Sequence, residues 1–210
     1  ASIGNHVVQR LASQDVRRLV RLVLGELAKV WRYNRQQNRI QIGIDGQISN
    51  WAVSGLDAYG LKLGPDVQLH YLDTSTPLFR VGGQEQIDPE LFLRSAPSFL
   101  AWLLRWLFVQ DVVARYYDFR RVVIDLIANF YKEQLPDLVP ALIAEANDFF
   151  AHEASAPQIA PIALHEVQSY YRQDALIWRL YLSFRRIDRF LHIHILHKDY
   201  PYILPVIARR

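Results

Sequence analysis

The sequence predicts an α+β fold that is mainly helical, with a small set of antiparallel strands near residues 39–73. Apolar residues recur at helical spacing before that segment, alternate within it, and return to helical spacing after residue 88. Half of the 210 residues are hydrophobic and 21% are charged, which is typical of a globular chain. The length suits a single domain or lobe over residues 1–210.

Residues 1–38 are expected to be helical. Apolar residues between Val16 and Trp31 recur every three or four positions, with arginine and lysine between them. Ser13 can cap this helix, or it can mark a break within a helix that begins near Asn5. The polar residues 34–38 are expected to end it.

Residues 39–75 are expected to hold the strands and a catalytic loop. Ile40, Ile42 and Ile44 alternate with other residues, which predicts a strand. Glycines between residues 55 and 64 predict a hairpin, and its return strand ends near Tyr71. Residues 74–87 are expected to form a loop.

Residues 88–210 are expected to be helical. Asp88-Pro89-Glu90 is a capped helix start, and Ser95-Ala96-Pro97 is a second candidate start. Asp118 can cap a helix that ends before Pro136. Two further helices are expected at about 138–152 and 165–190, separated by a linker rich in proline and alanine.

Composition excludes several classes of chemistry. The chain has no cysteine, so it has neither disulfides nor thiolate sites, and a cytoplasmic location is the expectation. It also has no methionine, so either an initiator was removed before Ala1 or the chain is a piece of a longer protein. The most apolar run, residues 99–109, is interrupted by Arg105 and is too short to span a bilayer.

The net charge of +3 is unevenly distributed, because eight arginine and lysine residues lie within the first forty positions. They form either a solvated helix face or a surface that faces an anion. Aromatic residues do not alternate with these arginines, so nucleic acid is an unlikely partner.

Asp45, Asn50 and Asp73 form the pattern that most suggests chemistry. Asp45 follows a predicted strand, Asn50 lies five residues later, and Asp73 ends the return strand of the hairpin. Phosphoryl transfer needs a carboxylate near the attacking hydroxyl and oxygen ligands that hold magnesium. The same residues also suit a simpler interpretation, in which Asp45-Gly46 is a tight turn and Asn50 and Asp73 are turn residues.

Residues 7–135 resemble the C-terminal lobe of the kinase-like fold shared by protein kinases, aminoglycoside phosphotransferases and choline kinases. DGQISN is similar to the catalytic loop, and YLDTS is similar to the strand end that carries a metal ligand. The resemblance implies that Asp45 is the catalytic base and that Asn50 and Asp73 bind Mg²⁺. It also implies transfer of phosphate from ATP to a hydroxyl of a small molecule. The segments 91–108 and 116–134 also resemble an uncharacterised bacterial family.

The sequence departs from the kinase-like pattern at several positions. Gly43-Ile44 precedes Asp45 where relatives have His or Arg, Gln47 replaces a lysine, and Thr74-Ser75 follows Asp73. No glycine-rich phosphate loop and no strand lysine precede the first helix. The chain is therefore expected to be a fragment or a lobe that has lost ATP chemistry, so whether it is an enzyme stays open.

Two further groups of residues suggest sites. His192, His194 and His197 suggest a metal site but lack acidic partners at a suitable spacing, which favours a structural role. Trp102 and Trp106 lie on a segment that is apolar nearly all round. It is expected to be core, or to contact a missing N-terminal lobe, a second subunit or a membrane surface in a non-catalytic interaction module.

Overall fold

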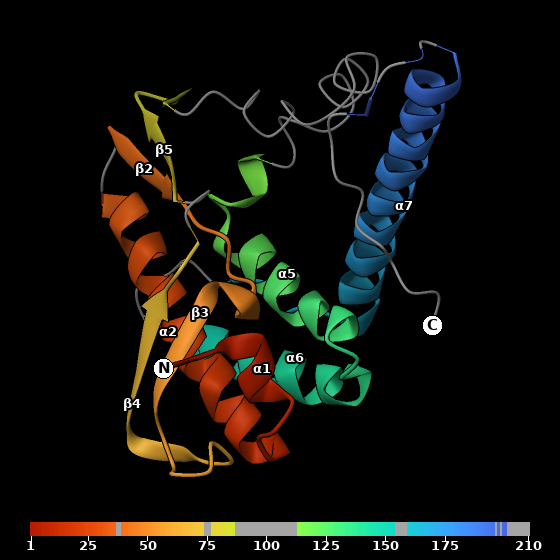
Figure 1. Cartoon of the computed structure of the whole chain (residues 1–210). Coiled ribbons are helices and arrows are strands. Elements are labelled where there is room, and N and C mark those ends of the chain that lie inside the picture. Colours follow the sequence, from red (N-terminus) through yellow and green to blue (C-terminus); the bar gives the residue numbers. More distant parts are fainter. Residues whose placement is uncertain are drawn as a thin grey trace. The chain divides into compact units, whose positions relative to one another are not determined.

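The fold is α+β with helix predominating, as the sequence predicts (Figure 1). The computed structural model describes residues 1–36, 39–73, 77–86, 113–153, 159–195, 197 and 199–200. The chain forms two compact units, the first of residues 1–87 and 113–171 and the second of residues 88–112 and 172–210. The expectation of a single lobe stays a prediction.

The chain begins with a short strand and two helices: β1 (Ser2–Ile3), α1 (Gly4–Val8) and α2 (Ser13–Gln36). The break that Ser13 was expected to mark is confirmed, because α1 ends at Val8 and α2 begins at Ser13. One face of α2 is buried, and it includes most of the apolar residues whose spacing predicted the helix. The buried residues are Val16, Leu19, Val20, Val23, Leu24, Leu27 and Ala28.

The strands form two antiparallel sheets of three strands each. The first has the order β1–β3–β4, where β3 is Trp51–Leu56 and β4 is Leu63–Tyr71. The second has the order β2–β5–β6, with strands Ile40–Gly43, Leu78–Val81 and Gln84–Glu85. The predicted hairpin is the β3–β4 pair, in which Trp51 lies opposite Tyr71.

The prediction of a loop over residues 74–87 is wrong for residues 78–85, which form the β5–β6 hairpin. Gly82 and Gly83 both have positive φ, so they make the two-residue turn. Arg80 pairs with Glu85 across the hairpin at 2.5 Å. Tyr117 donates to Glu85 at 2.8 Å, so the small sheet is held against the residues that precede α5.

The later helices of the described chain are α5 (Phe119–Lys132), α6 (Val139–His152) and α7 (Leu164–His194). The predicted cap is confirmed, because Asp118 accepts a hydrogen bond from the Arg121 backbone N–H at 3.0 Å. The predicted helix starts at residues 88 and 95, and the Trp102 and Trp106 segment, lie outside the described residues. None of the helices in the described ranges has the length and apolar character needed to cross a membrane.

The core of the first unit lies where α2, α5 and α6 pack together (Figure 1). Helix α5 is buried over nearly its whole length from Phe119 to Phe130. Its side chains are inaccessible to solvent at Val123, Leu126, Ile127 and Phe130. Because α5 is enclosed in this way, the core packing also fixes which groups lie next to its buried polar side chains.

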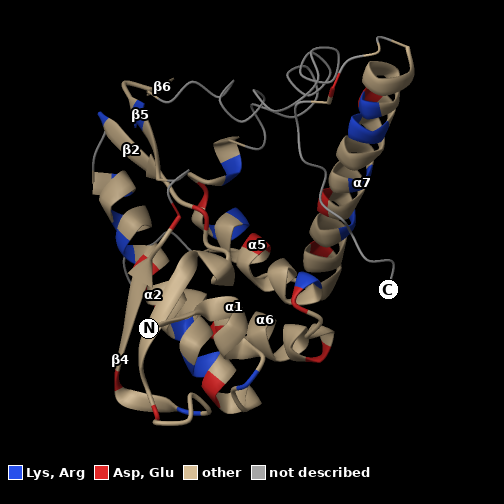
Figure 2. Cartoon of the chain, viewed as in Figure 1, with Lys and Arg blue, Asp and Glu red and all other residues tan. Residues whose placement is uncertain are grey.

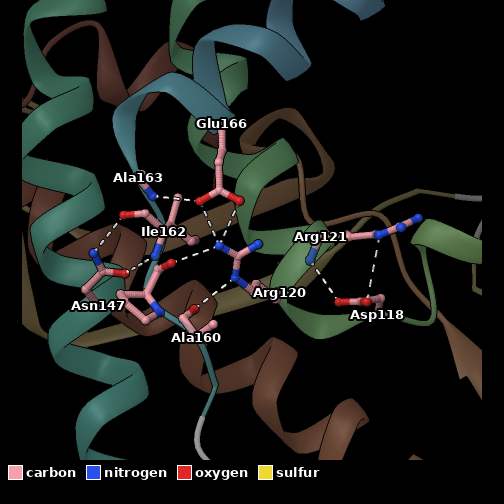
Figure 3. Close-up of polar contacts among 9 residues, drawn as sticks. Asp118, Arg120, Arg121, Asn147, Ala160, Ile162, Ala163 and Glu166 are labelled. Atoms are coloured by element: carbon pink, nitrogen blue, oxygen red, sulfur yellow. Dashed lines mark hydrogen bonds and ion pairs between the residues drawn. The ribbon is translucent and has the colours of Figure 1, made fainter.

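The segment that leads into α7 is fixed to α5 and α6 by polar contacts (Figure 3). Arg120 of α5 donates to the carbonyl oxygens of Ala160 and Pro161 and pairs with Glu166 at 2.8 Å. Asn147 of α6 bonds both the N–H and the C=O of Ile162. The first two turns of α7 are therefore part of the first unit.

Lysine and arginine residues recur along α2 (Figure 2). Two of these arginines bond acidic residues of α6. Arg17 and Arg21 bond Glu145 at 3.1 and 2.5 Å, and Arg21 also bonds Asp148 at 2.8 Å. Both arginine side chains remain nearly half exposed. These two arginines are thus partly solvated, and the anions that they bind are carboxylates of the same chain.

Glu145→Gln should destabilise the fold by about 1–2 kcal/mol, because Glu145 is largely buried and accepts charged hydrogen bonds from two arginines. Asp148→Asn is the matched control and should destabilise the fold less than Glu145→Gln, since Asp148 is half exposed. Urea unfolding of the two variants measures the difference. Equal stabilities would contradict the role given to Glu145.

Candidate functional site

Asp45 lies in a short loop between β2 and a 3₁₀ turn (Ile48–Asn50). The Ile44 N–H donates to the Tyr116 carbonyl at 3.0 Å, which sets the direction of the chain as it enters the loop. The Asp45 Oδ1 accepts the Gln47 backbone N–H at 2.9 Å. The Asp45 carboxylate thus bonds the backbone two residues further on, which is the contact of an Asx turn.

The side chains of the β3–β4 hairpin hold the same loop from the other side. Tyr71 donates from its hydroxyl to the Asp45 carbonyl at 3.0 Å. The Trp51 indole N–H donates to the Gly46 carbonyl at 3.4 Å. The Leu72 N–H donates to the Asn50 carbonyl at 2.8 Å, so the end of β4 is fixed beside the loop.

Of the three residues predicted from the sequence, Asn50 and Asp73 both lie near enough to Asp45 to act on its carboxyl. The Asn50 side chain hydrogen-bonds to Asp45, which lowers the pKa of that carboxyl. The negative charge of Asp73 acts on Asp45 and raises its pKa. The roles assigned to them, Asp45 as base and Asn50 and Asp73 as metal ligands, stay predictions.

Two residues that the sequence analysis missed also belong to this site. Asp125 of α5 is 4% exposed and accepts the Gln47 side-chain amide at 3.3 Å. Burial raises its pKa, while Lys132, Gln47, Arg115 and Tyr170 act in the opposite direction. Burial, and then the charges of Asp45, Asp125 and Asp73, raise the pKa of Tyr116. Asp125 alone left a signal in the sequence, since it is a single carboxylate within an apolar helix face.

The surroundings of Asp45 give its carboxyl an unusual pKa. Burial first, and then the charge of Asp125, raise its pKa from 3.8 to about 6. Hydrogen bonds from Gln47 and Asn50 only partly offset these effects. A partly buried carboxyl with a pKa near neutrality is suited to exchanging a proton with a bound molecule.

The side-chain oxygens of Asp73 and Asn50 are compatible with magnesium, which prefers carboxylate, amide and water oxygens. Among the described residues no three His, Cys, Asp or Glu side chains converge to enclose a metal ion. Mg²⁺ usually binds through one or two protein carboxylates together with water and phosphate oxygens. Asp73 and Asn50 fit that mode of binding.

The C-terminal histidines do not form such a centre within the described residues. The His192 ring donates from Nδ1 to the Asp188 backbone carbonyl, 3.0 Å away on the preceding turn. His194 packs against Phe190 with ring centroids 4.7 Å apart. These local contacts agree with the structural role favoured by the sequence.

Comparison with protein families identifies the family of the chain. The model of the family of unknown function DUF6206 matches residues 5–190. The chain belongs to this DUF6206 family. No curated protein and no solved structure gave a match. The match covers strands β2 to β6 and the α2, α5 and α6 core, so the whole candidate site lies within the DUF6206 region.

Asp45→Asn should stabilise the protein at pH values above about 6. Between pH 3.8 and about 6 the folded Asp45 holds a proton that the unfolded chain has released, so the free energy of unfolding falls as pH rises through this range. Asparagine avoids this loss and keeps the acceptor for the Gln47 N–H. The variant should gain about 1–3 kcal/mol near pH 8 and nothing near pH 4.

Urea unfolding at the two pH values measures this gain. Asp66→Asn, at an exposed position of β4, is the control and should change stability by less than about 0.5 kcal/mol at either pH. A gain that is the same at both pH values would show that burial of the Asp45 charge is not its cause.

Gly46→Ala should destabilise the loop, because a Cβ atom there would lie 2.7 Å from Val122 Cγ1 and 3.0 Å from Leu27 Cδ1. The expected cost is about 1–3 kcal/mol, which is typical of overpacking in a core. Gly25→Ala is the control, since nothing lies within 4 Å of its added Cβ and alanine favours the helix. Thermal unfolding should move in opposite directions for the two variants.

Proposed function

We propose that this DUF6206 protein is a kinase-like phosphotransferase lobe that transfers phosphate from Mg²⁺·ATP to a hydroxyl of a small molecule. The supporting observation is that Asn50 and Asp73 both act on the Asp45 carboxyl, whose pKa is raised to about 6. The kinase-like resemblance of the sequence requires these three positions to meet. A cytoplasmic location, where ATP is available, is part of this proposal.

Asp45 would accept the proton of the acceptor hydroxyl as that oxygen attacks the γ-phosphorus. The new bond forms between the acceptor oxygen and phosphorus, and the bond to the β,γ-bridging oxygen breaks, so ADP leaves with the electron pair. At pH 7.5 a carboxyl with a pKa of about 6 is mostly ionised and can take the proton. Its hydrogen bonds to Gln47 and Asn50 would hold it in position during the attack.

Asn50 and Asp73 would bind Mg²⁺ at the phosphates. The metal supplies neutralisation of the charge that develops on the transferred phosphoryl group. The backbone bond from Leu72 to the Asn50 carbonyl keeps these two ligands near each other. Binding the metal would also offset the repulsion between Asp45 and Asp73.

Asp45→Asn should lower the kcat of Mg²⁺-dependent ATP turnover by about 10²–10⁴, because the proton acceptor is lost. Asp73→Asn should raise the concentration of Mg²⁺ required, because one metal ligand becomes neutral. Asp66→Asn is the control and should leave both unchanged. Release of ADP, followed with and without a panel of small alcohols, sugars and amino alcohols, measures turnover.

Binding is tested separately by thermal unfolding of the wild-type chain with Mg²⁺ and ATP. Ligand at 100 times its dissociation constant should add roughly 2.7 kcal/mol to stability. Absence of both turnover and a thermal shift would reject the phosphotransferase proposal.

A non-catalytic interaction module is the second candidate. The Trp102 and Trp106 segment behind it lies outside the described residues. In the second unit, however, Leu176, Trp178 and Phe190 of α7 are each more than half exposed. Exposed apolar residues of this size favour a partner, such as an N-terminal lobe, a second subunit or a membrane surface.

A further inference from the structure

The side chain of Gln47 connects the Asp45 loop to helix α5. Its Nε2 donates to Asp125 Oδ2 at 3.3 Å, and its Oε1 accepts from Asn129 Nδ2 at 3.1 Å. Asp125 and Asn129 lie four residues apart, so they occupy the same face of α5 one turn apart. Both are buried, at 4% and 3% exposure. One amide therefore spans two polar groups in the interior.

The main chain of the same residue contacts the candidate base. The Gln47 N–H donates to Asp45 Oδ1 at 2.9 Å. Tyr71 and Trp51 also hold the loop, but they bond backbone carbonyls and not the carboxylate. Gln47 thus combines a contact with the Asp45 carboxylate and an attachment to the buried helix.

We propose that Gln47 is a positioning residue, whose amide fixes the Asp45 carboxylate relative to α5 without contacting the substrate. The proposal rests on the function proposed above and gives Gln47 a role within that site. Loss of the amide would remove one hydrogen bond each from the buried side chains of Asp125 and Asn129, and the loop would shift in response. A displacement of about 1 Å at a reacting group can cost about 10²-fold in rate.

An exchange of side chains tests this role. Gln47→Glu places a second carboxylate against Asp125 and removes the donor between them. In the double variant Gln47→Glu/Asp125→Asn, the amide introduced on α5 can donate to the carboxylate introduced in the loop. That carboxylate can still accept from Asn129. The double variant therefore restores the hydrogen bonds with the net charge of the wild type.

The expected kinetic result is a change in kcat rather than in KM. Gln47→Glu should lower the kcat of Mg²⁺-dependent ATP hydrolysis by about 30- to 100-fold, with the KM for ATP within about threefold of wild type. The double variant should recover to within about tenfold of wild type. Gln68→Glu, at an exposed position of β4, is the control and should have no effect.

Three kinetic outcomes would overturn the proposal. The first is that both kcat and KM are unchanged in Gln47→Glu. The second is that KM rises in this variant while kcat is unchanged. The third is that activity does not recover in a double variant that melts like wild type. The second outcome would mean that Gln47 contacts the nucleotide. Gln47→Met has a similar length and no charge, and it replaces Gln47→Glu if the latter does not fold.

A second measurement needs no catalysis and separates this inference from the phosphotransferase proposal. The Trp51 indole N–H donates to the Gly46 carbonyl, so its proton–nitrogen NMR resonance reports the position of the loop. The resonance should move in Gln47→Glu and return towards its original position in the double variant. If wild type turns over no ATP but the resonance behaves in this way, only the proposed function fails. A resonance that stays in place in Gln47→Glu overturns the positioning role.

Discussion

The contact between the Asp45 loop and helix α5 is the constraint on which the candidate site depends. Gly46 lies so close to Val122 and Leu27 that no side chain fits between them. Beside it, Gln47 is bonded to Asp125 and Asn129 through its side chain. Because α5 is enclosed by the core, a loop attached to it at these neighbouring points is held as firmly as the core itself. The position of the Asp45 carboxylate follows from core packing, although Asp45 is not a core residue.

The distribution of charge separates this site from the rest of the unit. Between α2 and α6, Arg17 and Arg21 neutralise Glu145. At the site, by contrast, burial raises the pKa of Asp45 most, and the charges of Asp125 and Asp73 raise it further. Only hydrogen bonds from Gln47 and Asn50 lower it. Carboxylates that repel one another reduce the stability of the fold. An arrangement that is locally unfavourable in an otherwise well-paired unit is more readily explained by function than by stability.

Hydrophobic periodicity predicted the elements but not all of the site. The spacing from Val16 to Trp31 was sufficient for α2, and the alternation from Ile40 was sufficient for β2. The β5–β6 hairpin was missed because its strands are short, although the glycine pair at 82 and 83 is a recognised signal for such a turn. Asp125 is eighty positions from Asp45 and is brought to it only by the packing of α5. The partners of Arg17 and Arg21 are even more remote, on α6, so periodicity could not choose between the two interpretations of the basic residues.

The turn interpretation explains one part of the geometry at Asp45. A carboxylate that closes a turn needs a single backbone donor, and the Gln47 N–H is that donor. Asparagine or serine would serve equally well in such a turn, and neither would add a further negative charge near Asp125 and Asp73. The turn therefore accounts for the presence of a short polar side chain, but it does not explain an ionisable one. A requirement for proton transfer or for binding a cation does explain it, and for this reason we favour chemistry at this loop over a purely structural role.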